Sequence, residues 1–214
     1  MKTSARIGWA LCGLALLMAA ACASAPKVPP SGFLSNYQAL KPDPQIRGLF
    51  WWERPGVEWK GYTRLIIDPV QVRVDKSRSQ RDLKPGEAQE LARRLRAAVI
   101  KELKGGVKVT SQPGPGVLRL RAALVHLKPV NPTMNVLSSA IMMWPMDMGQ
   151  AAVEVQFQDS LSRRILGELV ISSEGEMSDV TRVWTRWAQV EHTFAQWARL
   201  LRQAMLGDKR PARR

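Results

Sequence analysis

Hydrophobic and polar residues alternate with a period of two in several stretches of the chain, as in β-strands with one buried face. Strands are predicted at residues 48–53, 62–74, 107–109, 117–127, 151–158 and 165–171. The last two form a hairpin across the turn at Asp159-Ser160. Pro69 cannot donate a hydrogen bond to a neighbouring strand, so it predicts an edge position or a bulge within the 62–74 stretch.

Two other stretches repeat apolar residues every three or four positions, as amphipathic helices do. The first covers Glu87 to Lys104, with acidic residues at its start and lysines near its end, which suits the helix dipole. The second covers Asp179 to Leu206, and we expect Asp179 to be its N-cap. Its apolar stripe, which we expect to face the core, consists of Val183, Trp187, Val190, Phe194, Trp197, Leu201 and Ala204.

The predicted elements follow one another as strand, strand, helix, strand, strand, hairpin and helix. Such an order is typical of a layered α+β fold. We therefore predict an antiparallel or mixed sheet with two main helices packed on one face. Residues 32–40 are too apolar for a linker, so we expect this N-terminal arm to pack on the domain.

The first 30 residues have the layout of an export signal. Lys2 and Arg6 form a positive n-region, and residues 7–21 form an apolar h-region without charge. This run is shorter than the about 20 apolar residues that a membrane-spanning helix needs. The signal therefore predicts that the chain crosses a membrane.

Two cleavage sites are compatible with this signal. Ala19-Ala20-Ala21-Cys22 forms a lipobox in which the usual leucine, three residues before the cysteine, is an alanine. Cleavage there makes Cys22 the acylated first residue of a lipoprotein, held firmly by several acyl chains. Ala23-Ser24-Ala25 is instead an ordinary signal-peptidase site that leaves Pro26 at the new N-terminus. We favour the lipoprotein, and because no aspartate follows the cysteine, we expect an outer-membrane anchor facing the periplasm.

These signals divide the chain into four parts. They are a lipoprotein signal peptide at residues 1–21, a lipid-anchored tether and N-terminal arm at 22–47, an α+β domain at 48–206 and a basic C-terminal tail at 207–214. The domain is long enough to bury a core. Cys12 lies in the signal, so at most Cys22 remains after cleavage and no disulfide is possible.

The formal net charge of the chain is +14, and it becomes +12 when the signal, which carries two cations and no acid, is removed. Nucleic acid is the usual partner of so basic a chain, but the export signal argues against it. An envelope protein meets anionic phospholipids and lipopolysaccharide phosphates instead. We therefore expect no nucleic-acid partner, and a membrane partner through lipidated Cys22.

Residues 129–149 are rich in methionine and contain three prolines and little charge. In one interpretation, residues 134–143 form a short helix that fills the core. In the other, the segment is an exposed loop that binds a partner, since methionine suits adaptable surfaces and exposed apolar patches tend to mark contact sites. The candidate interaction residues are Met134, Ile141, Met142, Met143, Trp144 and Met146.

Residues with catalytic or metal-binding chemistry are sparse. His126 and His192 are the only histidines, and neither has a second histidine or a cysteine at ligand spacing. Gly114-Pro115-Gly116 precedes a strand rather than a helix, so it is no phosphate loop. A hydrolase is the weakest alternative, because no nucleophile elbow marks it. We expect a non-catalytic protein without cofactor or metal.

Several motifs occur in a recognisable order along the mature chain. They are Ser31-Gly32-Phe33-Leu34, Tyr37, Leu40-Lys41-Pro42, Tyr62, Leu65, Asp68-Pro69-Val70, residues 113–121, Asp159-Ser160, Trp187, Val190, Phe194, Trp197-Ala198 and Leu201-Arg202. With them the chain resembles a family of bacterial lipoproteins called domain of unknown function 3313. It departs from that family at the lipobox alanine and at Leu161-Ser162, where Thr-Gly is common. The resemblance implies a cell-envelope lipoprotein and implies no activity.

Two hypotheses about function follow. In the first, the chain is an outer-membrane-anchored accessory protein that binds an envelope protein partner or its own copies through the apolar segment at residues 134–148. In the second, it is a binding module for an anionic envelope lipid or glycolipid, in line with its positive charge and its aromatic residues. Salt separates the two, because screening weakens exposed charge contacts but not an apolar interface.

Overall fold

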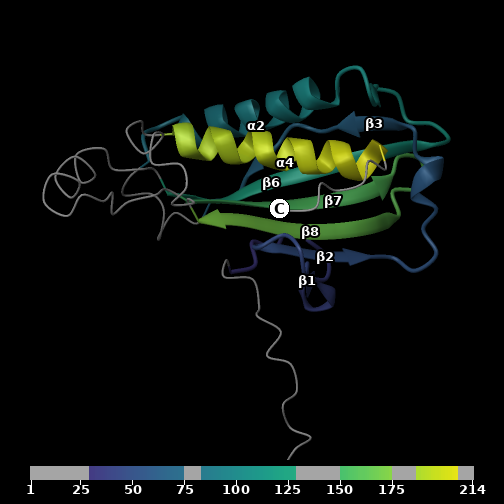
Figure 1. The fold of residues 1–214 in the computed structure, drawn as a ribbon, viewed down its shortest axis with the longest axis horizontal. Coiled ribbons are helices and arrows are strands. Elements are labelled where there is room, and N and C mark those ends of the chain that lie inside the picture. Colours follow the sequence, from purple (N-terminus) through teal and green to yellow (C-terminus); the bar gives the residue numbers. More distant parts are fainter. Residues whose placement is uncertain (1–28, 75–82, 129–149, 175–186, 207–214) are drawn as a thin grey trace, which may run out of the picture.

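A mixed sheet of eight strands carries two long helices on one of its faces (Figure 1). The computed structural model describes residues 29–74, 83–128, 150–174 and 187–206. The strands are β1 (Lys41–Pro42), β2 (Leu49–Glu53), β3 (Arg64–Ile67), β4 (Gln71–Val72), β5 (Lys108–Val109), β6 (Val117–Lys128), β7 (Gln150–Asp159) and β8 (Ile165–Glu174). The helices are α2 (Glu87–Leu103) and α4 (Ala188–Leu206), with short 3-10 helices at Tyr37–Ala39 and Trp59–Gly61.

The strands lie in the order β1-β2-β8-β7-β6-β3-β5, and β4 pairs with β6 beyond the end of β3. The neighbouring strands in the series β1-β2-β8-β7-β6 are antiparallel. By contrast, β3 runs parallel to both β6 and β5. This topology confirms the predicted α+β class, with the mixed rather than the purely antiparallel sheet. The hairpin of β7 and β8 is also confirmed.

Pro69 separates β3 from β4 in the stretch that was expected to be one strand. Four residue steps from Ile67 to Gln71 lie opposite three steps from Leu120 to Ala123 on β6, so this segment contains one extra residue. This irregularity agrees with the bulge that a proline within a strand predicts. The pairing of β5 with β3 stops at Leu65, and β4 beyond Pro69 pairs with β6 alone among the described strands, so the edge position also agrees.

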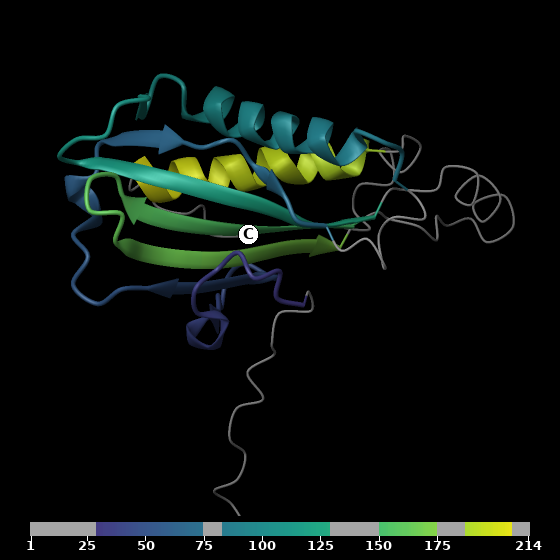
Figure 2. The same cartoon turned by 180° about the vertical axis from the view of Figure 1, so that it is seen from behind.

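The two faces of the sheet are covered by different parts of the chain. The helices α2 and α4 lie side by side on one face, and the N-terminal arm at residues 31–40 packs on the other (Figures 1 and 2). The main core lies between the sheet and the helices, and a smaller cluster joins Phe33 and Leu34 of the arm to Ala123, Val125 and Ala152. The prediction that the arm packs on the domain is therefore confirmed.

The apolar stripe of the C-terminal helix faces the sheet as expected within the described residues. Val190 and Phe194 are buried in the main core, whereas Trp197 and Leu201 are half-buried beside it. The predicted N-cap Asp179 and the first turns up to residue 186 lie outside the described residues. Among the helices that the structure describes, none has the length and apolar character to span a membrane.

Candidate functional site

An apolar cavity of about 210 Å³ lies between the sheet and the two helices. Five strands contribute its floor, namely β2, β8, β7, β6 and β3, and α2 and α4 contribute its roof. All of its lining residues are apolar except Asp43 and Arg96. The cavity therefore crosses the middle of the domain, and its lining residues belong to strands and helices except for Asp43, Ile46 and Val70.

The packing of α4 explains why this space is left open. The helix packs mainly along α2 and touches the sheet chiefly at β7. Trp51 of β2 and Leu169 of β8, opposite Trp197 and Leu201 of α4, are only half-buried although all four are apolar. Half-buried apolar side chains on both floor and roof mean that the cavity is not sealed from solvent.

Three aromatic rings gather at one side of the cavity: Trp51 of β2, Phe157 of β7 and Trp59 of the second 3-10 helix. The ring centroid of Trp51 lies 5.9 Å from that of Trp59 and 5.7 Å from that of Phe157, and the last two are 6.0 Å apart. Such tilted and edge-on pairs are favourable beyond the area they bury. Gly167 of β8 makes room for this cluster, because a Cβ there would lie 2.7 Å from the Cη2 atom of Trp51.

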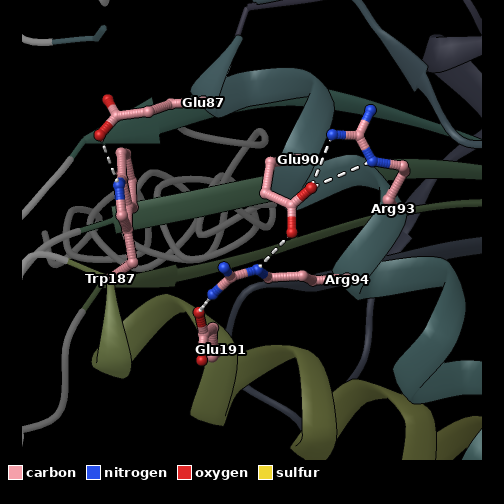
Figure 3. Close-up of polar contacts among 6 residues, drawn as sticks. All are labelled: Glu87, Glu90, Arg93, Arg94, Trp187 and Glu191. Atoms are coloured by element: carbon pink, nitrogen blue, oxygen red, sulfur yellow. Dashed lines mark hydrogen bonds and ion pairs between the residues drawn. The ribbon is translucent and has the colours of Figure 1, made fainter.

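A set of polar contacts joins the helices of the roof at their first turns (Figure 3). Glu90 of α2 accepts hydrogen bonds from Arg93 and Arg94 of the same helix, and Arg94 also pairs with Glu191 of α4. These guanidinium groups, Arg94 before Arg93, hold the pKa of the Glu90 carboxyl below its ordinary value. These contacts are exposed and each adds little stability. The Arg94–Glu191 pair and the hydrogen bond from Trp187 Nε1 to Glu87, at 3.1 Å, join the two segments.

The opposite face of the sheet holds the arm through a buried carboxylate. Glu154 of β7 is 1% exposed and accepts hydrogen bonds from the Ser31 amide (3.2 Å), the Ser31 hydroxyl (2.6 Å) and the Tyr37 hydroxyl (2.7 Å). Burial, followed by the hydrogen bond to Glu154, raises the pKa of Tyr37, so this hydroxyl stays protonated as a donor. Tyr37 in turn accepts from the amides of Phe33 and Leu34.

A second carboxylate repeats this arrangement on the neighbouring strand. Glu168 of β8 is fully buried and accepts from the amides of Ser35 and Asn36 at 2.8 and 3.1 Å. The side chain of Gln156 donates to the same carboxylate at 2.7 Å. Two buried carboxylates thus satisfy the backbone of the arm, which is what burial of a charge requires. They serve attachment of the arm, and the apolar cavity lies on the other side of the sheet.

The structure does not describe any of the residues that the sequence marked as candidate sites. The predicted lipidation site Cys22 and the interaction residues Met134, Ile141, Met142, Met143, Trp144 and Met146 lie outside the described residues. Both assignments stay predictions. Within the described part of the chain, no three His, Cys, Asp or Glu side chains are placed to hold a metal ion.

Sequence reasoning missed the cavity and the buried carboxylates. Glu154, Gln156 and Gln158 alternate with apolar residues in the predicted strand at 151–158, a pattern that by itself indicates a solvated face. The burial of Glu154 and Gln156 depends on an arm more than 100 residues away. Trp51, in the predicted strand at 48–53, lines the cavity. No local pattern shows that α4 leaves part of the sheet uncovered, because that depends on how two distant helices pack.

Comparisons with known proteins locate the chain in a family. None of the curated protein sequences matches it. Among solved structures, it is similar to the PelC dodecamer from Paraburkholderia phytofirmans, with 8% identity, a TM-score of 0.41 and coverage of 71% of this chain and 96% of that one. It is also similar to the hypothetical protein CT253 from Chlamydia trachomatis, with 10% identity, a TM-score of 0.40 and coverage of 68% and 99%.

A third similar structure is the protein XCC0632 from Xanthomonas campestris, with 12% identity, a TM-score of 0.39 and coverage of 72% of this chain and 90% of that one. A family model described as "Protein of unknown function (DUF3313)" matches residues 29–201. The match includes the arm that the two buried carboxylates hold, both long helices up to Leu201, and every strand of the described sheet. The chain therefore belongs to the family of proteins of unknown function DUF3313.

Proposed function

We propose that this protein is a lipid-anchored cell-envelope protein that binds the apolar chain of a lipid inside its α+β domain. The observation that carries the proposal is the cavity of about 210 Å³ between the sheet and the helices, with walls that are apolar except at Asp43 and Arg96. Ligand sites are typically concave and mostly apolar, with a few polar groups that set orientation. The cavity has both properties.

The energetics of an empty apolar cavity support an occupant. A space lined by leucine, isoleucine and phenylalanine gives water no hydrogen-bond partners, and one of about 150 Å³ stays dry and binds benzene. Apolar walls that stay in contact with water are unfavourable, by roughly 25 cal/mol per Å² of apolar surface. An acyl chain restores the missing contacts, so binding and stability are coupled.

We propose binding rather than catalysis at this site. The two polar lining residues offer one carboxylate and one guanidinium, and the other walls consist of side chains without a nucleophile or a base. Asp43 already accepts hydrogen bonds from the amides of Gln45 and Ile46. The arrangement suits retention of an apolar ligand, with no group positioned to cleave it.

Filling the cavity tests the proposal. Ala122 of β6 is 4% exposed and lines the cavity, so Ala122→Phe inserts a ring into the ligand space. We expect the purified, delipidated protein to bind a fluorescent fatty acid and the variant to bind it at least about tenfold more weakly. Circular dichroism checks that the variant is folded. Leu161→Phe, on the exposed turn between β7 and β8, is the control with the same added ring. A parent protein that binds no apolar ligand refutes the proposal.

The envelope location is part of the proposal and rests on the signal sequence. We propose that Cys22 is acylated, that the anchor lies in the outer membrane and that the domain faces the periplasm. We expect Cys22→Ser to release the protein from the membrane fraction, because several acyl chains supply most of the membrane affinity. Mass spectrometry of the mature N-terminus checks the acylation. A Cys22→Ser protein that stays membrane-bound and begins at Pro26 contradicts it.

A second proposal keeps the protein-binding hypothesis. We propose that the segment at residues 134–148 contacts an envelope protein partner or a second copy, and its methionine-rich apolar composition supports this. A photo-crosslinking residue at Met143 in living cells should give a discrete protein adduct. Lipid adducts alone, or loss of folding on Met143→Asp, would remove the support for a partner surface.

A further inference from the structure

A second, more polar cleft adjoins the apolar cavity. It measures about 390 Å³ and lies between the β3–β4 segment and the outer side of α2. Its lining residues are Pro69, Val70, Val72, Gln89, Ala92, Arg93 and Arg96. Val70 and Arg96 line both spaces, so the cleft and the cavity meet at these two residues.

Each polar side chain that lines this cleft can donate hydrogen bonds. Arg93 and Arg96 are cations, and Gln89 is a neutral amide that lies one helical turn before Arg93. No carboxylate belongs to the lining. Planar guanidinium groups match the geometry of carboxylate and phosphate oxygens. The cleft therefore favours an anionic group.

Arg96 differs from its neighbours on α2 in how its charge is compensated. Arg93 and Arg94 pair with Glu90, and Arg94 also pairs with Glu191. Arg96 donates from Nε and Nη2 to the backbone carbonyl of Ile67 at 3.2 and 3.0 Å. Among the residues that the structure describes, no carboxylate pairs with it.

The contacts with Ile67 hold the guanidinium of Arg96 at the junction of the two spaces through Nε and Nη2. The residue is half-buried and lines the apolar cavity. A guanidinium at such a site can add a charge-assisted hydrogen bond to an anion. A long cationic side chain of this kind can cover apolar surface with its stem while its head meets a polar group.

We infer that the ligand of the apolar cavity is an anionic amphiphile, whose chain occupies the cavity and whose carboxylate or phosphate head pairs with Arg96. Arg93 lines the same cleft, with its guanidinium already paired with Glu90. The inference rests on the proposed function and adds the charge of the ligand and the residue that selects it. Fatty acids and phospholipids share this chemistry, and both are present in a cell envelope.

Ligands that share one chain and differ only in the head test the inference. Dodecanoate, dodecyl phosphate and dodecanol compete with the fluorescent fatty acid for the delipidated protein. We expect both anions to bind at least about tenfold more tightly than the alcohol, since a charge-assisted bond at a half-buried site contributes at least that much. Dodecanoate and dodecyl phosphate together distinguish a carboxylate head from a phosphate head.

Variants assign the preference to Arg96. Arg96→Gln removes the cation, and we expect it to weaken the anions about tenfold while dodecanol changes less than about twofold. Arg96→Lys keeps the charge and should keep most of the preference for anions. Gln89→Glu leaves Arg96 intact, places a negative charge in the cleft and should weaken the anions selectively. Arg199→Gln, at an exposed position of α4, controls for the loss of one charge.

The possible outcomes separate the two proposals. If none of the three ligands binds the parent protein, the proposed function fails and the inference fails with it. If all three bind equally well, or if Arg96→Gln weakens the alcohol as much as the anions, the cavity binds apolar chains but the inference is wrong. Selective loss of the anions in both Arg96→Gln and Gln89→Glu supports it.

Discussion

At the scale of single residues, the walls of the cavity depend on small side chains opposite large ones. Gly167 lies beneath Trp51, and Ala122 leaves space where a leucine-sized residue would reach toward the roof. Neither residue has a functional group that would identify it as part of a binding site from the sequence. Glycine and alanine within strands usually indicate only a close approach of another group. Their importance follows from the neighbours that the fold brings to them.

Gly167→Ala tests the aromatic wall. The new Cβ would lie 2.7 Å from Cη2 of Trp51, so the indole must move. We expect the free energy of unfolding to fall by about 1–3 kcal/mol, as overpacking does, with a shift in tryptophan emission and weaker ligand binding. Urea denaturation followed by fluorescence measures both effects. Gly61→Ala, where nothing lies within 4 Å of the added Cβ, is the control and should change stability by less than about 0.5 kcal/mol.

Asp159 makes the stability of the β7–β8 turn depend on pH. Its carboxylate accepts from the amide and the hydroxyl of Ser162, both at 2.8 Å, and from the hydroxyl of Tyr62 at 3.1 Å. The backbone hydrogen bond from Ser162 is the main cause that lowers the pKa of Asp159 below its ordinary value. A carboxyl with a lowered folded-state pKa stabilises the fold above its unfolded pKa and loses this effect as pH falls through the folded pKa.

We therefore expect Asp159→Asn to lower the free energy of unfolding by about 1 kcal/mol near neutral pH. The difference from the parent should shrink as the pH descends from about 5 to about 2, because the parent carboxyl becomes protonated in that window. Urea midpoints measured across this range give the result. A difference that stays constant with pH would show that the carboxylate charge does not stabilise the turn.

At the scale of elements, periodic patterns predicted most of the fold. The helix at 87–104, the strand at 117–127 and the hairpin at 151–171 are described within one to three residues of their predicted ends, because each has a strong period of its own. The order of strands in the sheet could not be read in this way. The position of β8 between β2 and β7 depends on pairing between segments about 120 residues apart, such as Leu49 with Ile171.

Hydrogen bonds to buried side chains attach the N-terminal arm to the sheet. Tyr37 links it to Glu154 and accepts from the amides of Phe33 and Leu34. We expect Tyr37→Phe to loosen the arm, because it leaves those amides and the carboxylate short of partners, and unmet buried groups cost about 1–3 kcal/mol each. Limited chymotrypsin digestion should then cleave after Leu40, which packs against the apolar cluster beneath the arm, several-fold faster.

Gln38→Ala is the matched control for this digestion, because Gln38 is an exposed residue of the same 3-10 helix. Its cleavage rate at Leu40 should equal that of the parent protein. Equal rates for Tyr37→Phe and the parent would mean that the apolar contacts of Phe33 and Leu34 hold the arm without the carboxylate.

At the scale of the whole molecule, the sheet separates two functions. One face attaches the arm, and the other carries the cavity and the adjoining cleft. The chain from Cys22 to Ser31 can span at most about 30 Å when fully extended, so a lipid on Cys22 would hold the arm-bearing side of the domain near the bilayer. The family assignment was predictable from motifs along the mature chain and is confirmed over residues 29–201. The cavity was not predictable, since it arises only where two helices cover part of a sheet.

The central claim is that the domain holds a lipid without a covalent bond, and native mass spectrometry tests it most directly. The protein, expressed with its own signal and purified from the envelope in mild detergent, should carry an adduct with the mass of an anionic lipid in addition to the anchor. Gentle activation should release this adduct, and Ala122→Phe should lack it. A parent protein with no such adduct, which also fails to take up dodecanoate or dodecanol after delipidation, would contradict the account.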